Sequence, residues 1–283
     1  MNTPSISIVT AFFDIGRSDW TTEKGLPEYL ERSNDKYFSY FAKLAKLDNH
    51  MVIFCEENHK DKILELRQGK STEVVTLDFK NSFQSCRDKV ISIQQDINFQ
   101  QKIDPKQRNN PEYWSADYVL INNLKTYFIN QAIKQNLIKD ELVAWVDFGY
   151  CRDDDTLGKL THWYYPFNKE RVHMFILEPT HYFGTIPNFR FPNTVAKAQK
   201  AIFMNKPFII GGVLVATQEK WQIFANIIKD CHHGLLKKNI IDDDQGIYLL
   251  CRAQHKSLIQ LNYLTKIKRR KLNWFGVFKL YSK

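Results

Sequence analysis

The sequence predicts one α/β domain, and three features of the chain point to it. Short apolar runs rich in β-branched and aromatic residues alternate with longer segments of helical periodicity. The 283 residues are enough to bury a full core. No repeat or low-complexity linker divides the chain, so we expect a single domain over residues 1–265 and a basic, aromatic tail over 266–283.

Strands are predicted where apolar residues follow one another without interruption. The run Leu142–Val146 is apolar throughout, as expected for a central strand that is covered on both faces. The predicted strands are Ile6–Phe13, Met51–Cys55, Val74–Leu77, Leu142–Val146, Val172–Leu177 and Ile209–Val215.

Helices are predicted where apolar residues recur at helical spacing, as Ile121, Leu124 and Phe128 do. The predicted helices are Tyr37–Leu47, Lys60–Gln68, Lys89–Asp96, Trp114–Leu137, Trp221–Asp230 and Asp244–Ala253.

Composition and charge exclude several classes of protein. The formal net charge is +9, but the last 18 residues hold seven basic side chains and no acidic one. The rest of the chain is therefore nearly neutral, which argues against a nucleic-acid partner. The longest apolar run, residues 208–216, is too short for a membrane span of about 20 residues. With no readable signal peptide and five scattered cysteines, we expect a cytoplasmic protein.

Familiar catalytic and nucleotide-binding motifs are missing from the sequence. It contains no GxGxxG, GxxxxGK[ST] or GxSxG, which argues against Rossmann dehydrogenases, P-loop NTPases and α/β-hydrolases. The eight histidines are dispersed and form no HxxxH pair, which argues against a zinc enzyme.

Polar residues follow the first predicted strand, where ligands bind in open α/β sheets. The segment includes Thr10, Ala11, Phe12, Asp14 and Arg17. A nucleotide could lie here, with its base against the backbone near Ala11 and a phosphate on the forked Arg17 guanidinium. The alternative is a simple turn with a solvated arginine.

A second strand end carries Asp147, followed by Gly149 and Tyr150. A carboxylate directly after a buried strand suits a sugar hydroxyl or a divalent cation. The alternative is that Asp147 stabilises a turn at Gly149.

The third polar segment contains Asp243, Asp244 and Gln245 at the start of the predicted helix Asp244–Ala253. One aspartate is enough to cap a helix, so the others could position a sugar or act as a general base. Capping alone is the alternative.

These segments together resemble GT-A glycosyltransferases, because Asp147, then Gly211 and Gly212, then Asp244-Gln245 occur in the order those enzymes use. More closely, residues 10–17 together with 145–152 resemble the HtrL/YibB family over nearly the whole chain. The resemblance implies a GT-A-like fold whose mixed, mostly parallel sheet is flanked by helices.

The activity that the resemblance implies is sugar transfer from a nucleotide-sugar donor to a bacterial surface glycan, such as lipopolysaccharide, lipooligosaccharide or capsule. Gly211 and Gly212 would let the backbone approach donor or acceptor. Asp244 would be the base of an inverting enzyme, whereas Gln245 would face the reacting carbon of a retaining one. The second possibility is a non-catalytic protein that binds nucleotide sugars or glycans.

The family of GT-A enzymes commonly binds metal through Asp-x-Asp, and this sequence departs from that motif. It reads Asp147-Phe148-Gly149, so Asp147 would hold Mn²⁺ or Mg²⁺ alone or with help from elsewhere. His181 and His255 are the candidates for further ligands.

The tail combines the basic run Lys266–Lys271 with Trp274, Phe275, Phe278 and Tyr281. Such a segment could attach the enzyme to the anionic inner leaflet of the inner membrane, near a lipid-linked acceptor. The alternatives are that its aromatic side chains pack onto the domain, or that the tail binds nucleic acid.

Overall fold

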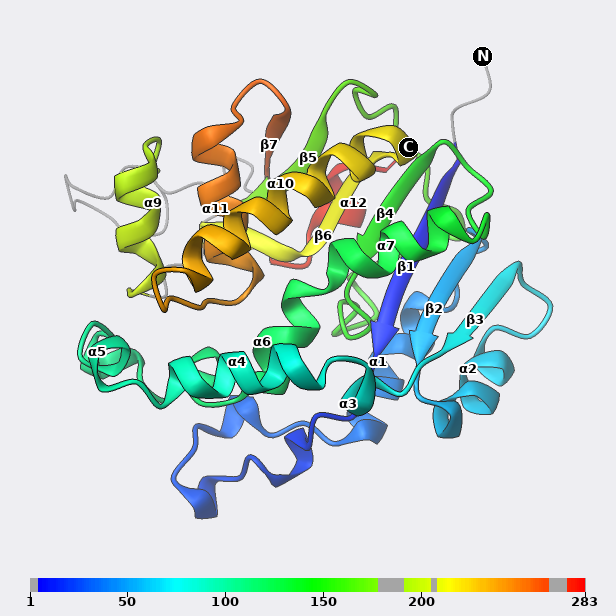
Figure 1. The fold of residues 1–283 in the computed structure, drawn as a ribbon. Helices are drawn as coiled ribbons and strands as arrows, with labels where there is room; N and C mark the ends of the chain where they lie inside the picture. Colours follow the sequence, from blue (N-terminus) through cyan, green and yellow to red (C-terminus); the bar gives the residue numbers. More distant parts are fainter. Residues whose placement is uncertain (1–4, 178–190, 205–207, 265–273, 283) are drawn as a thin grey trace.

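The computed structural model describes residues 5–177, 191–204, 208–264 and 274–282. Its centre is a seven-stranded sheet with the order β3-β2-β1-β4-β6-β5-β7 (Figure 1). The strands are β1 (Ile6–Phe12), β2 (Met51–Cys55), β3 (Thr72–Thr76), β4 (Leu142–Val146), β5 (Val172–Ile176), β6 (Ile209–Thr217) and β7 (Ile259–Tyr263). Neighbouring strands are parallel except where β6 runs antiparallel to β4 and β5. The predicted α/β class with a mixed, mostly parallel sheet is confirmed.

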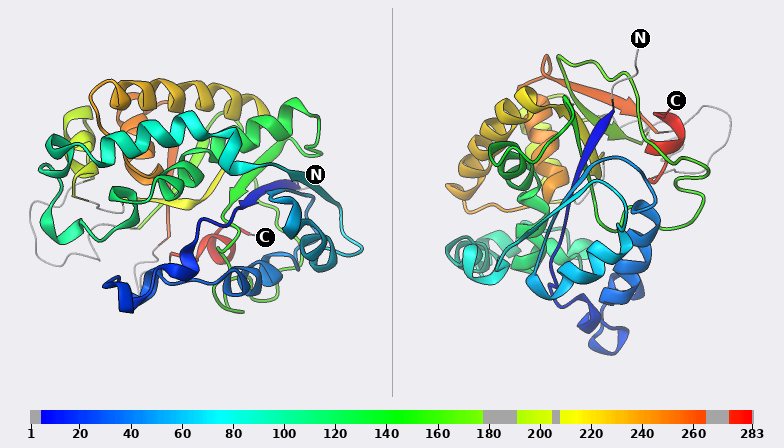
Figure 2. Two further views of the ribbon diagram at one scale, coloured as in Figure 1. Left: turned by 60° about the horizontal axis from the view of Figure 1, so that its bottom comes forward. Right: turned by 90° about the vertical axis from the view of Figure 1, so that its right-hand side faces the viewer.

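Helices cover both faces of this sheet (Figure 2). On one face, a hydrophobic cluster joins the sheet to most of the longer helices. These are α4 (Gln84–Gln94), α6 (Ala116–Asn123), α7 (Lys125–Lys134), α9 (Val195–Ile202), α10 (Gln218–Leu236) and α11 (Asp244–Gln254). The short α3 (Phe79–Ser82) and α5 (Ile97–Gln100) pack in the same cluster. On the other face lie α1 (Asn34–Leu44), α2 (Lys60–Leu66) and α12 (Val277–Leu280).

The strand register brings three chain segments to one edge of the sheet. Strands β1 and β4 are parallel, so their carboxyl ends finish together, at Phe12 and Val146. Because β6 is antiparallel to β4, its first residues lie at this same edge, with Val213 opposite Val146. Binding sites of open α/β sheets form at such an edge.

The predicted helix Trp114–Leu137 is two helices, and this expectation is corrected. The helix α6 ends at Asn123 and α7 begins at Lys125, with Leu124 between them at φ −86° and ψ 1°. The apolar spacing continues through the break, so periodicity alone does not reveal it. The break places Lys125 in the first turn of α7.

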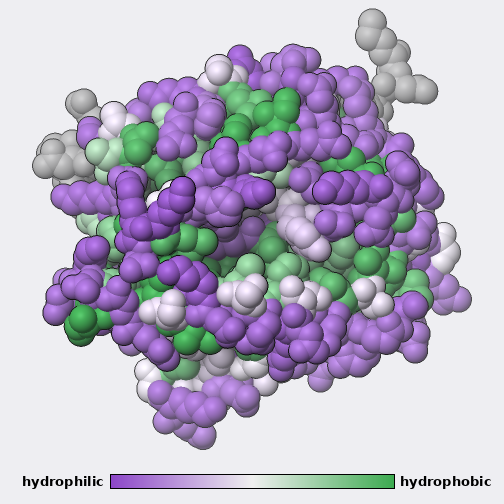
Figure 3. Space-filling model, in the orientation of Figure 1, coloured by the Kyte–Doolittle hydropathy of each residue, from purple (hydrophilic) through white to green (hydrophobic). Residues whose placement is uncertain are grey.

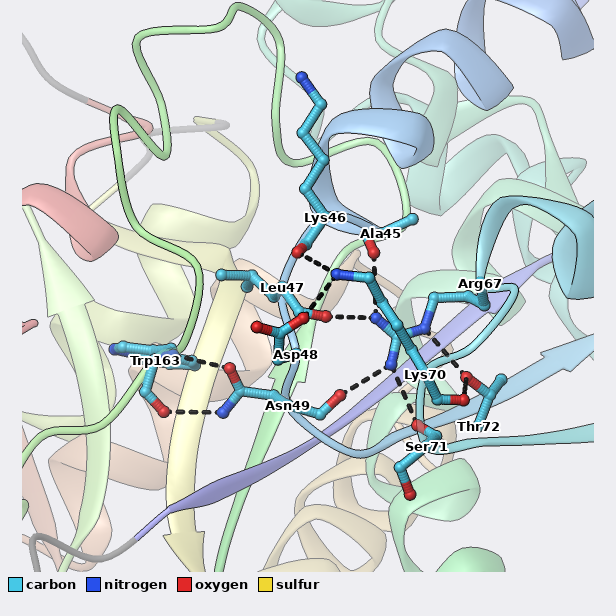
Figure 4. A network of polar contacts seen from close by, with 10 residues as sticks. All are labelled: Ala45, Lys46, Leu47, Asp48, Asn49, Arg67, Lys70, Ser71, Thr72 and Trp163. Atoms are coloured by element: carbon cyan, nitrogen blue, oxygen red, sulfur yellow. Dashed lines mark hydrogen bonds and ion pairs between the residues drawn. The ribbon is translucent and has the colours of Figure 1, made fainter.

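A buried arginine ties the first two helices to the sheet (Figure 4). Arg67 is 1% exposed, and each of its five N–H groups has an acceptor. Four acceptors are backbone carbonyls, including those of Ala45 and Leu47 just beyond α1. Burial lowers the pKa of Arg67 to about 10. Complete hydrogen bonding is what allows such a group inside a core.

The aromatic residues of the tail that the structure describes pack onto the domain. Phe278 is 1% exposed, and its ring lies 4.8 Å from that of Trp163. The Trp163 indole donates a hydrogen bond to the Tyr281 carbonyl. The ring of Phe275 lies 5.4 Å from that of Tyr150. The basic run Lys266–Lys271 lies outside the described residues.

In the described ranges, no helix has the length and apolar character needed to cross a membrane. On the face shown in Figure 3, hydrophilic side chains predominate and hydrophobic ones form separate patches between them.

Candidate functional site

A pocket of about 590 Å³ opens at the edge where β1 and β4 end and β6 begins. The structure brings most of the predicted site residues together around it. Those that line it are Ala11, Phe12, Asp14, Arg17, Asp147, Gly149, Tyr150, Gly211, Gly212, Asp244 and Gln245.

Other predicted residues lie away from this lining. Thr10 is fully buried within β1. Asp243 is the N-cap of α11, where its Oδ1 accepts a hydrogen bond from the Gln245 N–H at 2.9 Å. His255 is exposed and follows the opposite end of α11 from Asp244. His181 lies outside the described residues.

Lys125 joins the two predicted carboxylates at the base of the pocket. Its Nζ lies 2.9 Å from Asp147 Oδ1 and 2.6 Å from Asp244 Oδ2, and it donates to the Gly211 carbonyl at 2.9 Å. An ammonium group has three protons, and these three acceptors use all of them. The side chains of Lys125 and Asp244 are only 4% and 3% exposed, so this ion pair is shielded from water.

Glycine at position 211 is a requirement of this arrangement. A Cβ there would lie 1.9 Å from Asp244 Oδ2, closer than any nonbonded carbon and oxygen can come. At Gly212 a Cβ would lie 3.0 Å from the Tyr150 ring and 3.4 Å from Asp147 Oδ2, which is tight but less severe. The pair of glycines therefore lets β6 run directly against both aspartates.

Asp147 presents one carboxylate oxygen to the pocket. Its Oδ1 accepts hydrogen bonds from the Trp145 indole at 2.7 Å and contacts Lys125. Its backbone N–H donates to the Gly212 carbonyl, which fixes the residue against β6. The side chain is 39% exposed, so Oδ2 is open to a ligand.

The two charges that are most deeply buried at this site stabilise each other. Burial raises the pKa of Asp244, and the neighbouring Lys125 ammonium limits the rise. Burial alone would lower the pKa of Lys125, but Asp147 and Asp244 outweigh it and raise that pKa. Lys125 therefore keeps its proton and supplies the positive charge between the two carboxylates.

The side chains around Asp147 do not fit the expected Mn²⁺ or Mg²⁺ ion. The Lys125 ammonium already occupies the position between the two carboxylates that a cation would take. In the part of the chain that the structure describes, no group of three or more His, Cys, Asp and Glu side chains has the arrangement of a metal site. Divalent cations in proteins are held by several oxygen ligands.

A second set of buried carboxyls surrounds the start of α11. Glu112, Asp242 and Asp243 are 2%, 5% and 6% exposed. Burial raises the pKa of Glu112 and of Asp242 well above the usual range, and burial with the charge of Asp244 raises that of Asp243 to about 7. These groups lie behind the pocket and not in its lining.

The loop after β1 is held by its own polar residues. Asp14 accepts hydrogen bonds from the Gly16 N–H and the Asn34 amide, at 2.8 Å each. Gly16 has φ 75°, a conformation that favours glycine. Arg17 is 8% exposed and is therefore not the solvated arginine of a simple turn.

Sequence reasoning did not identify Lys125, Arg32 or Arg152, which also line the pocket. Lys125 lies in a helical pattern where lysine is ordinarily solvent-exposed, and its partners come from distant segments. Arg152 belongs to the strand-end segment that carries Asp147, which is the one local signal for its position.

Comparisons with known proteins identify relatives over the full length. Residues 4–283 match a family described as "Bacterial protein of unknown function (HtrL_YibB)". The chain is 41% identical to "Protein HtrL" of Escherichia coli (strain K12) over 280 residues, which are 98% of this chain and 92% of that protein. Among solved structures, the crystal structure of mouse xyloside xylosyltransferase 1 in its apo form aligns with a TM-score of 0.39 and 11% identity, over 98% and 93% of the two chains.

Proposed function

The chain belongs to the HtrL_YibB family of bacterial proteins, and from that premise and the pocket we propose that it is a glycosyltransferase. Its donor would be a nucleotide sugar, and its acceptor a bacterial surface glycan such as lipopolysaccharide, lipooligosaccharide or capsule. The observation that carries the proposal is the buried Lys125 bridge between Asp147 and Asp244 at the carboxyl edge of the sheet.

The bridge supports this function because it fixes two carboxylates where a donor sugar would lie. The carboxylates of Asp147 and Asp244 both contact the same ammonium group, and without that cation two negative charges so close together would repel each other. Lys125 supplies that cation and fixes both orientations before any ligand arrives. Preorganised charges of this kind are usually the largest contribution to transition-state stabilisation.

The open Oδ2 of Asp147 suits a hydroxyl of the donor sugar, because an ionised carboxylate accepts hydrogen bonds from hydroxyl groups. The nucleotide would extend from there towards the loop after β1, where Ala11 and Phe12 offer backbone and ring surfaces. Gly211 and Gly212 would leave room for the sugar beside β6.

Asp244 and Gln245 would face the anomeric carbon, and their contacts favour different roles. Asp244 is 3% exposed and ion-paired, which makes it a better electrostatic partner than a proton acceptor. Gln245 lines the pocket, and its buried Oε1 has no hydrogen-bond partner within the described chain, so a rotation of the amide group would bring it to the reacting sugar. Of the two courses that the resemblance leaves open, this arrangement favours the retaining one.

We place the enzyme in the cytoplasm, where nucleotide sugars would reach it, with contact to the inner leaflet through the basic run Lys266–Lys271. Because the described tail aromatics pack on the domain, this contact would rest on charge. Anionic headgroups attract basic residues by about 1 kcal/mol each.

A thermal-shift screen tests donor binding, with UDP, GDP, CMP and ADP sugars compared side by side. We expect one class to raise the melting temperature, because binding to the folded state stabilises it. The same donor should stabilise Asp155→Asn equally, since Asp155 is exposed, pairs with Lys279 and lies outside the pocket lining. Asp147→Asn should show a much smaller shift. A donor that binds but is never hydrolysed or transferred would favour the non-catalytic binding protein.

A further inference from the structure

Three arginines of the pocket have no carboxylate partner among the described residues. They are Arg17, Arg32 and Arg152, and all three line the pocket. Within the described ranges the ion pairs of arginine involve only Arg87 and Asp117. The lining acids are otherwise engaged, because Lys125 holds Asp147 and Asp244 while the loop holds Asp14.

Arg17 is the most informative of the three, because it is nine-tenths buried and yet incompletely bonded. It donates from Nη1 to the Tyr37 hydroxyl at 2.5 Å and from Nη2 to the Leu30 carbonyl at 3.0 Å. Its Nε is buried and has no acceptor among the described residues. Arg67, which is purely structural, satisfies all five of its N–H groups. Because Arg17 also lines the pocket, an anion bound there would supply acceptors to this incompletely bonded guanidinium.

The other two arginines belong to the same positive region. The Arg32 N–H donates to the Arg17 carbonyl at 3.2 Å, so their backbones are adjacent. The Arg152 guanidinium lies 4.7 Å from the centre of the Tyr40 ring and 5.5 Å from that of Phe275. In the described ranges, its buried Nε also lacks an acceptor. Burial lowers the pKa of Arg17 and of Arg152, and the charge of Arg32 lowers both further. Three positive charges that lie close together with no carboxylate beside them in the described ranges would be stabilised by a bound anion.

We propose that Arg17, Arg32 and Arg152 bind the diphosphate of the donor and neutralise it as it leaves, in the role that a divalent cation plays elsewhere. The inference rests on the proposed function and assigns the leaving-group subsite. Guanidinium groups bind phosphate oxygens through paired N–H donors, which gives both charge and direction.

During sugar transfer, negative charge accumulates on the leaving diphosphate, so positively charged side chains are needed most beside it. The bond between the anomeric carbon and the β-phosphate oxygen breaks, and its electron pair stays on that oxygen. The acceptor hydroxyl oxygen forms the new bond to the anomeric carbon, and its proton passes to the released diphosphate or to water. The arginines stabilise the negative charge that accumulates, which Lys125 cannot do because its three protons are already donated.

Titration calorimetry in the presence of EDTA tests the subsite directly. The probes are inorganic pyrophosphate, a panel of nucleoside diphosphates, and glucose 6-phosphate as a phosphorylated sugar without a nucleoside. We expect pyrophosphate and one nucleoside diphosphate to bind without any metal. Arg32→Gln and Arg152→Gln should each weaken that binding about tenfold or more, as the loss of a hydrogen bond to a charged group does.

Arg108→Gln is the matched control, because Arg108 is exposed and outside the lining. It should bind like the wild type and unfold at the wild-type temperature, as should Arg32→Gln, because Arg32 forms no carboxylate contact within the described chain. Arg152→Gln loses its contacts with the Tyr40 and Phe275 rings, so its binding is compared at a temperature where thermal unfolding shows it to be folded. Binding that requires added Mg²⁺ or Mn²⁺, or that is unchanged in both pocket variants, would overturn the proposal. Preference for glucose 6-phosphate over every diphosphate would also overturn it.

The outcomes separate this inference from the proposed function. If arginine-dependent diphosphate binding occurs but no nucleotide sugar binds or reacts, the subsite stands and the transferase proposal fails. If a nucleotide sugar is turned over equally well by Arg32→Gln and Arg152→Gln, the transferase stands and the arginine subsite is wrong.

Discussion

Lys125 is the residue on which the geometry of the pocket depends most. It holds Asp147, Asp244 and the Gly211 carbonyl at once, so three segments of the chain meet at one ammonium group. A buried charge with this many partners is costly to disturb, because Asp244, which is 3% exposed, is left desolvated and unpaired when the lysine is removed.

We predict that Lys125→Met destabilises the protein by about 3–5 kcal/mol, as measured by urea unfolding. The substitution leaves Asp244, 3% exposed, without its counter-ion. Asp147→Asn is the contrasting variant, because the pair of Lys125 and Asp244 survives in it. Wild-type stability of Lys125→Met would mean that the two aspartates do not depend on this lysine.

At this scale the sequence predicts the acids of the site but not the cation that links them. Asp147 directly follows the strand β4, and Asp244 is the first residue of the helix α11. Both positions are marked by the local sequence. Lys125 has no such signal, because its acceptors come from the end of β4, from β6 and from α11. Only the tertiary fold makes it a buried residue. The same holds for Arg32, which nothing in its neighbourhood marks as a pocket residue.

Among the elements, α11 connects the pocket to the buried acids behind it. Its N-cap is Asp243, whose carboxylate lies among Glu112, Asp242 and Asp244, with Lys125 as the nearby cation. Burial and Asp244 raise the pKa of Asp243 to about 7, whereas an unfolded aspartate titrates near 3.9. At a pH between about 3.9 and about 7, Asp243 therefore holds a proton in the folded protein that it has released in the unfolded chain.

We therefore predict that the free energy of unfolding falls as pH rises from about 4 to about 7. Asp243→Asn should reduce this loss and raise the melting temperature at pH 8, because asparagine caps the helix without a charge. Asp243→Ala also removes the charge but loses the cap, so it should be about 1 kcal/mol less stable than the asparagine variant. Identical pH profiles for the wild type and Asp243→Asn would show that another group titrates.

Helix α10 offers a test that is independent of the pocket. Gly234 lies on it, is exposed, and a Cβ there would have no neighbour within 4 Å. We predict that Gly234→Ala raises the free energy of unfolding by about 0.5–1 kcal/mol, because alanine loses less backbone entropy in a helix. Gly211→Ala should do the opposite, since its Cβ would collide with Asp244. A destabilised Gly234→Ala would contradict the described end of α10.

The elements show where periodicity is sufficient and where it is not. Continuous apolar runs predicted β2 and β4 with the bounds that the structure gives them. The strand β7 was not predicted, because Gln260 and Asn262 interrupt its apolar residues. Helix α10 starts at Gln218, earlier than predicted, because the Thr217 hydroxyl caps it. Caps and breaks depend on single contacts and not on a repeating pattern.

For the whole molecule, the uneven distribution of charge is the feature that bears on location. The basic side chains of the tail supply most of the net charge of +9. We predict that replacing Lys268–Lys271 by glutamine reduces sedimentation with anionic vesicles at low salt and leaves the melting temperature unchanged. Substituting the exposed Lys102 and Lys106 in the same way is the control and should have little effect. Equal sedimentation of all variants would reject a membrane role for the basic run.

The measurement that tests the central claim most directly is release of the nucleoside phosphate from the donor class selected by thermal shift. We predict that the wild-type protein and Asp155→Asn release it at the same rate. Asp147→Asn should remain folded and lose activity about a hundredfold, as expected when one preorganised charge is removed from the reacting centre. Near-wild-type release by a folded Asp147→Asn protein would contradict the assignment of this pocket as the site of sugar transfer.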